Sequence, residues 1–197
     1  MRVFIASPGY SIAEKKLNLE IDSVIKGAGF STFLLERDCP EYGLLVAELR
    51  KREYAPDQAR DIASSVIGFL IYRQCYIECD VTVLNLNGRV PDEGSIIAAG
   101  ISFASGKHLV TYCDDSRRLF YGIHHPLITV LTLSEMVNRI EEIPPALRRC
   151  FESDQTSRTR IGKMAADISV QYHFSDQHQP SLSEFLDLIE RRFPRQE

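Results

Sequence analysis

The sequence lacks the patterns that identify several common classes of protein. It contains no G-x-G-x-x-G and no G-x-x-x-x-G-K-[ST] motif, so the usual dinucleotide and nucleoside triphosphate sites are not expected. Residues 64–72 are apolar but far too few to span a bilayer, and the opening residues lack the apolar core of a signal peptide. We therefore expect a cytoplasmic protein that is not inserted in a membrane.

The sequence also lacks an excess of positive charge and a cluster of metal ligands. A formal net charge of -4 gives no electrostatic reason to expect binding to nucleic acid or to an anionic membrane. Five cysteines are an odd number, without the dense even spacing of a disulfide framework. Cys75 and Cys79 lie four residues apart, but no second cysteine pair or histidine pair completes a zinc site. We expect neither a metal nor a cofactor.

Short apolar runs alternate with amphipathic segments along the chain. Buried strands are predicted at residues 2–6, 30–35, 81–86 and 109–112. Helices are predicted at residues 12–28, 44–54, 95–105 and 134–143, and a longer one begins at Pro56. The pair Pro144-Pro145 predicts a break in the chain's helical pattern. Strands that alternate with helices predict a parallel sheet covered on both faces.

The pattern weakens toward the carboxyl end. Residues 1–145 are predicted to form one α/β domain, and residues 146–197 a helical extension that packs on it. The extension would end in a helix over residues 182–193, which a capping box at Ser181 and Glu184 introduces.

Ligands of parallel α/β sheets bind in the crevice at the carboxyl ends of the strands. The loops that follow the four predicted strands are SPGY (7–10), ERDCPEYG (36–43), NGRVPDEG (87–94) and CDDSRR (113–118). Three of the four carry carboxylates. The acidic pair Asp92-Glu93 at a helix start would repel a phosphate, whereas it suits hydroxyl and amino donors such as a sugar or a nucleobase edge.

Residues 79–112, CDVTVLNLNGRVPDEGSIIAAGISFASGKHLVTY, resemble the signature of the nucleoside 2-deoxyribosyltransferase family, and the opening RVFIASPGY is similar to its first strand and turn. The resemblance covers roughly residues 1–130. It implies a flavodoxin-like, Rossmann-like fold with a doubly wound, five-stranded parallel sheet flanked by helices. It also implies transfer of a 2-deoxyribosyl group between nucleobases, or hydrolysis of the N-glycosidic bond, by a homo-oligomer in which a neighbouring chain completes the site.

Carried over by position, the resemblance gives a set of site residues and one departure. The implied substrate-binding residues are Phe4, Ser7, Pro8, Gly9, Gly94 and Ser95. The family's nucleophilic glutamate falls on Ala98, which cannot attack a sugar. The carboxylates left as catalytic candidates are Asp92, Glu93 and Asp80.

Three functions are therefore open. The protein cleaves or transfers N-glycosidic bonds with a different carboxylate, in which case hydrolysis is favoured because a carboxylate that only activates water tolerates a wider gap to the sugar. Alternatively, it is an inactive module that binds nucleosides, or its fold serves an unrelated ligand or assembly. Ser7 and Ser95 could hold the 5′-phosphate of a nucleotide, although turn and N-cap roles are the commoner use of such residues.

Overall fold

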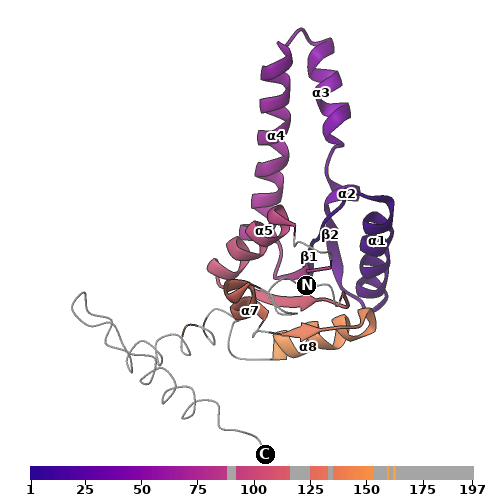
Figure 1. The fold of residues 1–197 in the computed structure, drawn as a ribbon, viewed down its shortest axis with the longest axis vertical. Helices are drawn as coiled ribbons and strands as arrows, with labels where there is room; N and C mark the ends of the chain where they lie inside the picture. The colour runs from indigo at the N-terminus through magenta and orange to yellow at the C-terminus, as the bar shows by residue number, and fades with distance from the viewer. Residues whose placement is uncertain (88–91, 116–124, 133–134, 153–158, 160–161, 163–197) are drawn as a thin grey trace, which may run out of the picture.

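A computed structural model of the chain describes residues 1–87, 92–115, 125–132, 135–152, 159 and 162. Its centre is a five-stranded sheet with the strand order β2-β1-β3-β4-β5 (Figure 1). The strands are β1 (Arg2–Ala6), β2 (Ser31–Leu34), β3 (Val81–Asn85), β4 (His108–Tyr112) and β5 (Met136–Val137). Every pairing is parallel. The predicted flavodoxin-like fold is thereby confirmed.

Strand β1 lies between the two strands that follow it in the sequence. Phe4 pairs with Phe33 on one side and with Thr82 on the other. The chain therefore leaves β1 in one direction to form β2 and then returns past β1 to form β3. This reversal opens a crevice at the carboxyl ends of β1 and β3, where ligands of doubly wound sheets bind.

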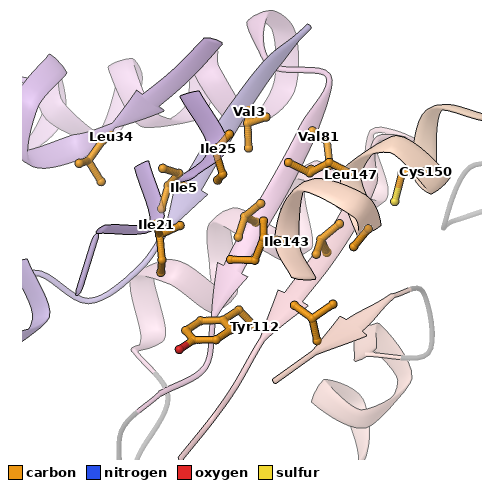
Figure 2. Packing of buried hydrophobic residues seen from close by; sticks show 14 residues of the cluster. Val3, Ile5, Ile21, Ile25, Leu34, Val81, Tyr112, Ile143, Leu147 and Cys150 are labelled. Atoms are coloured by element: carbon orange, nitrogen blue, oxygen red, sulfur yellow. The ribbon is translucent and has the colours of Figure 1, made fainter. Parts of the chain in front are cut away.

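Helices α1 (Ile12–Gly27) and α8 (Ile143–Glu152) cover one face of the sheet (Figure 2). A capping box starts α1, since Ser11 Oγ accepts from the Glu14 amide and Glu14 accepts from the Ser11 amide. Its apolar stripe places Ile21 and Ile25 in the core beside Ile5, all of them at most 2% exposed. The periodicity that predicted this helix thus corresponds to its buried face.

The other face is covered by α5 (Glu93–Ala104), by α7 (Pro126–Thr132) and by the π-helical turn η1 (Gln74–Glu78). Small residues bring α5 close to the sheet: Ala98 and Ala99 are buried against the apolar core. Thr82 Oγ1 donates to Ser102 Oγ at 2.7 Å, which satisfies both buried hydroxyls.

Between β2 and β3 the chain forms a short turn and a long helical hairpin. The turn is α2 (Leu35–Asp38), and the hairpin consists of α3 (Tyr42–Lys51) and α4 (Pro56–Arg73). The two helices lie side by side and project away from the sheet (Figure 1). We call α3 and α4 the arm. Pro56 occupies the first turn of α4, where its missing amide hydrogen costs nothing.

The prediction of a helix over residues 134–143 was wrong. Met136 and Val137 form the edge strand β5, and α8 begins at Ile143 with Pro144 and Pro145 in its first turn. A first turn does not use these amides, so the proline pair begins a helix instead of breaking one. The proposed boundary at 145/146 falls inside α8, whose Leu147 is fully buried in the sheet core. The expected helix at 182–193 lies outside the described residues.

None of the helices in the described residues combines the length and the apolar character needed to cross a membrane.

Candidate functional site

A cavity of about 280 Å³ opens at the carboxyl end of β1, close to the lower end of the roughly 300–1,000 Å³ typical of ligand pockets. We call it the β1 cavity. It is lined by Phe4, Ile5, Ala6, Ser7, Pro8, Gly9, Tyr10, Leu35, Glu36, Ile71, Asp92, Gly94, Ser95 and Ala98. The lining comes from β1 and its following loop, from the starts of α2 and α5, and from the end of α4. All six residues predicted to bind substrate are therefore brought together.

The floor of the cavity is apolar and ends in one unpaired hydroxyl. Phe4 is 4% exposed and packs against Phe33 with ring centroids 5.7 Å apart. Ser7 Oγ is buried and has no hydrogen-bond partner among the described residues. A buried hydroxyl without a partner costs free energy, so a ligand atom at this position would remove the cost.

Asp92 lies on the β3 side of the cavity and caps α5. Its Oδ2 accepts from the Ser95 amide at 2.7 Å and from Ser95 Oγ at 2.6 Å. Ser95 is thus occupied as a capping partner, one of the two roles open from the sequence. A hydrogen bond to Asp92, together with the charge of that carboxylate, raises the pKa of Tyr10, so the phenol stays protonated beside it.

Glu36 lies on the β2 side of the same cavity and was not selected from the sequence. Asn18, fully buried on α1, donates from Nδ2 to Glu36 Oε1 at 2.6 Å and to the Pro8 carbonyl at 2.7 Å. Both acceptors face the same nitrogen, which fixes the orientation of the amide. Glu36 Oε1 also lies only 2.5 Å from where a Cβ on residue 9 would be, so Gly9 makes room for the carboxylate.

An ion network next to Glu36 fixes the turn α2. Arg37 Nη1 donates to both carboxylate oxygens of Asp22 at 2.9 Å, and Asp38 Oδ2 accepts from the Leu34 amide at 2.8 Å. Burial of Asp22 acts to raise its pKa. Hydrogen bonds from Lys26, Thr32 and Arg37 outweigh that effect and hold the pKa below its ordinary value.

The other predicted catalytic carboxylates lie elsewhere. Glu93 is exposed in the first turn of α5 and is not part of the cavity lining. Asp80 precedes β3 at the amino ends of the strands, opposite the cavity, where its Oδ2 accepts from the Arg2 amide at 2.8 Å. Because β3 has five residues, roughly 16 Å separates Asp80 from the mouth of the cavity. Of the three candidates, Asp92 alone lines the cavity.

Ala98 faces the cavity from α5 and is 3% exposed. The position on which the resemblance places the family's nucleophile is thus a cavity wall without a functional group. Within the described residues, no three His, Cys, Asp or Glu side chains are grouped so that they could hold a metal ion.

The sequence contained a signal for Glu36 that was too weak to select it. The loop that begins with Glu36 was recognised as an acidic part of the mouth, but none of its three carboxylates stood out. Asn18 lies one turn before the buried Ile21 and Asp22 on α1. A polar residue on the buried face of a helix indicates a specific hydrogen-bond partner, and this is the signal that could have directed attention to Glu36.

No protein-family model and no curated protein sequence matches this chain. Eighteen solved chains align with this one, among them the following three. A conserved protein from Enterococcus faecalis V583 aligns with a TM-score of 0.53 and 18% identity over 76% of this chain and 98% of its own. A 2-deoxyribosyltransferase from Bacillus psychrosaccharolyticus aligns with a TM-score of 0.46 and 17% identity, over 73% and 90%. The CMP N-glycosidase BcmB of Clostridium botulinum gives 0.45 and 16%, over 75% and 99%. At 18% identity, the likeness to the Enterococcus faecalis protein is one of fold alone.

Proposed function

We propose that the β1 cavity binds a nucleoside and that the protein hydrolyses its N-glycosidic bond. The observation that carries the proposal is the pair of carboxylates, Glu36 and Asp92, that enter one mainly apolar cavity from opposite sides of β1. Apolar walls suit the faces of a nucleobase, and carboxylates accept hydrogen bonds from sugar hydroxyls or from amino groups of the base. An anion also stabilises the oxocarbenium-like centre that forms when a glycosidic bond breaks.

The charge of the cavity favours a nucleoside over a nucleotide. A 5′-phosphate would lie near Glu36 or Asp92, and like charges within a few ångströms repel. Ser95, one of the two hydroxyls considered for a phosphate, already donates to Asp92. No group among the described residues bonds to the Ser7 hydroxyl, which suits a sugar hydroxyl as well as a phosphate.

Hydrolysis is favoured over transfer because the cavity wall at residue 98 carries no nucleophile. A base exchange needs a covalent glycosyl intermediate that survives until a second base arrives, whereas hydrolysis needs only a water molecule and a group that accepts its proton. The alternative is a nucleoside-binding module without activity, and Ala98 is the observation that favours it.

The test is chromatographic. The native protein and Ala98→Glu are incubated with each 2′-deoxynucleoside, with and without a second free base, while calorimetry measures binding. Release of base by the native protein supports the proposal. Exchange of bases by Ala98→Glu alone supports the inactive binding module, because the cavity then accepts a nucleoside and lacks only chemistry. Absence of binding and of product from both proteins would refute the nucleoside proposal.

The role of Asp92 needs a specific variant. Asp92→Ala removes the cap of α5 as well as a carboxylate, which costs roughly 0.5–2 kcal/mol of stability. Asp92→Asn keeps an acceptor for the Ser95 amide while removing the charge. A loss of nucleoside affinity in Asp92→Asn at unchanged melting temperature would support a direct contact between Asp92 and the ligand.

A homo-oligomer is the proposed form of the protein. Large apolar side chains are exposed on α4, η1 and the adjoining part of α5: Phe69 is 73% exposed, Ile77 65% and Ile97 63%. Tyr72 and Tyr76 stack beside them with ring centroids 5.4 Å apart. Apolar surface of this kind marks an interaction site. Light scattering should give a multiple of the chain mass, and Phe69→Glu should lower it; a native monomer would refute this part.

A further inference from the structure

We propose that Glu36 is the general base of the β1 cavity, and that Asn18 is the positioning residue that aims it. The inference rests on the proposed nucleoside hydrolysis and adds the group that activates water. With Glu36 as the base, no carboxylate is needed at residue 98, because the carboxylate enters the cavity from the β2 side instead of from α5.

The two carboxylate oxygens of Glu36 have different surroundings. Oε1 is held by Asn18 at 2.6 Å and lies against Gly9. Within the part of the chain that the structure describes, Oε2 has no hydrogen-bond partner. Glu36 is exposed, so water reaches it from the mouth of the cavity. A carboxylate fixed at one oxygen and open to water at the other has the arrangement that a general base requires.

The support behind Glu36 is rigid. Asn18 is 0% exposed and is tied at the same time to the Pro8 carbonyl, so it cannot follow the carboxylate if that group moves. The next residue, Arg37, anchors α2 to the buried Asp22 of α1. Glu36 is therefore fixed through its side chain and through its own turn, whereas exposed glutamates generally lack such support.

Asp92 is less suited to the same task. Both Ser95 donors bond to one of its oxygens, and Tyr10 interacts with the carboxylate as well. Removing a proton from water would weaken the cap of α5 at the moment of reaction. Asp92 is better suited to accept a hydrogen bond from the sugar or the base, on the side of the ligand away from Glu36.

The proposed step balances in atoms and charge. Glu36 Oε2 takes one proton from a water molecule, and the water oxygen bonds to the anomeric carbon of the nucleoside. The bond from that carbon to the base nitrogen breaks, and its electron pair stays on the nitrogen. The base nitrogen is protonated by solvent, and Glu36 returns its proton to solvent. The products are the free base and the free sugar, with one water consumed.

This route predicts a specific stereochemistry. Water attacks the face opposite the leaving base, so the sugar is released with inverted anomeric configuration. No glycosyl ester forms, so a second base present in solution is not incorporated. Proton NMR recorded during the first turnovers distinguishes the two anomers. Retention of configuration, or incorporation of the second base, would overturn the assignment of Glu36 as a base.

The central experiment compares Glu36→Gln with Glu41→Gln. Glu41 belongs to the same acidic loop and is exposed, but it does not line the cavity. We expect Glu36→Gln to bind a 2′-deoxynucleoside within about threefold of the native affinity and to lose about 100-fold or more in kcat, the usual contribution of a general base. Glu41→Gln should keep the native rate. Native kcat in Glu36→Gln, or equal losses in both variants, would overturn the inference.

Failure of the inference and failure of the proposed function look different. A native protein that hydrolyses nucleosides independently of Glu36 overturns the inference and leaves the function standing. A native protein that binds nucleosides without cleaving them overturns the inference and leaves the binding module. A protein that neither binds nor cleaves overturns both.

The positioning role of Asn18 is tested by pH dependence. Asn18→Asp places a second carboxyl group beside Glu36, and a like charge disfavours the ionised form that acts as the base. The acidic limb of kcat/KM should move to higher pH. A merely structural defect would lower the rate without moving that limb, and such a result would overturn the positioning role. If Asn18→Asp does not fold, Gly9→Ala displaces the same carboxylate from the other side.

Discussion

Replacing Gly9 by alanine should move the Glu36 carboxylate without removing it. A Cβ at residue 9 would lie 2.5 Å from Glu36 Oε1 and 3.2 Å from Glu36 Cδ. Ordinary contact begins at 3.4 Å, so Oε1 must retreat by about 0.9 Å. Gly9 does not occupy the left-handed backbone region, and the clashing atoms end a flexible side chain. The backbone should therefore stay unstrained, and the main cost to the free energy of unfolding should be the hydrogen bond from Asn18 to Glu36, at most about 1.5–3 kcal/mol.

The effect on catalysis should follow from the displacement of the carboxylate. Oε1 cannot retreat and also keep its 2.6 Å bond to the rigid Asn18, so the carboxylate loses both its place and its anchor. Misplacing a catalytic group by 1 Å costs up to about 100-fold in rate. We expect Gly9→Ala to lower kcat for nucleoside hydrolysis by roughly 10- to 100-fold, with a smaller change in KM.

The assay is base release followed by chromatography, together with urea unfolding of the same samples. Gly27→Ala is the matched control, because a Cβ at that helical glycine meets no atom within 4 Å. A native kcat in Gly9→Ala would refute the reasoning, since the carboxylate would then work from a displaced position. An increase in KM alone would also refute it, because the methyl group would have narrowed the cavity without disturbing the base.

Three further predictions concern stability and reactivity. Because the pKa of Asp22 is lowered in the folded state, its ion network stabilises the fold above pH 3.8, the ordinary pKa, and this contribution is lost as the pH falls through the folded pKa. The urea midpoint of Asp22→Asn should therefore vary less with pH in acid than the native midpoint. At neutral pH the variant should be less stable by roughly 1.5–3 kcal/mol. Gly68→Ala, in the middle of α4 with open space around it, should raise stability by roughly 0.5–1 kcal/mol in a thermal melt. Burial raises the pKa of Cys75 to about 12 and that of Cys79 to about 11. A thiol reagent at about pH 8 should therefore label both cysteines only after unfolding. Rapid labelling of the folded protein would contradict this prediction.

The fold was predictable because its main elements are encoded locally. The apolar runs that became β1, β3 and β4 are buried on both faces, which leaves a continuous hydrophobic signature in the sequence. The helix α1 has a buried stripe and a capping box, and each can be recognised without knowing the partner elements. These signals predicted a parallel sheet covered on both faces, and the family resemblance added the doubly wound, five-stranded arrangement.

Elements that depend on distant contacts were not predictable. Strand β5 has two residues, and it exists because Thr111 and Tyr112 of β4 pair with it. The first turn of α8 contains Pro144 and Pro145. A proline pair ends a helix that precedes it but can begin a helix that follows it, and the local sequence does not decide between the two. In both cases tertiary packing selected one of two outcomes that the local sequence allowed.

The candidate site was predicted in part for the same reason. Phe4, Asp92 and Ala98 were selected because the family resemblance places site residues at those positions, and all three line the cavity. Glu36 lines it because Asn18, eighteen residues earlier, holds its side chain there. A polar residue on the buried face of α1 indicates that Asn18 has a partner, but it does not say which one, so the structure was needed to select Glu36 from the acidic loop.

The position of β1 also sets the order in which the site can be assembled during synthesis. Strands β1 and β2 are joined by a single helix and can pair early, as soon as residue 34 is available. The other edge of β1 must wait until β3 emerges at residues 81–85, after the entire arm. Until then, the half of the cavity that holds Glu36 faces solvent with no opposite wall. Only a chain whose sheet is complete can therefore bind a ligand in this cavity, and a bound nucleoside would stabilise the contacts of α5, which form late.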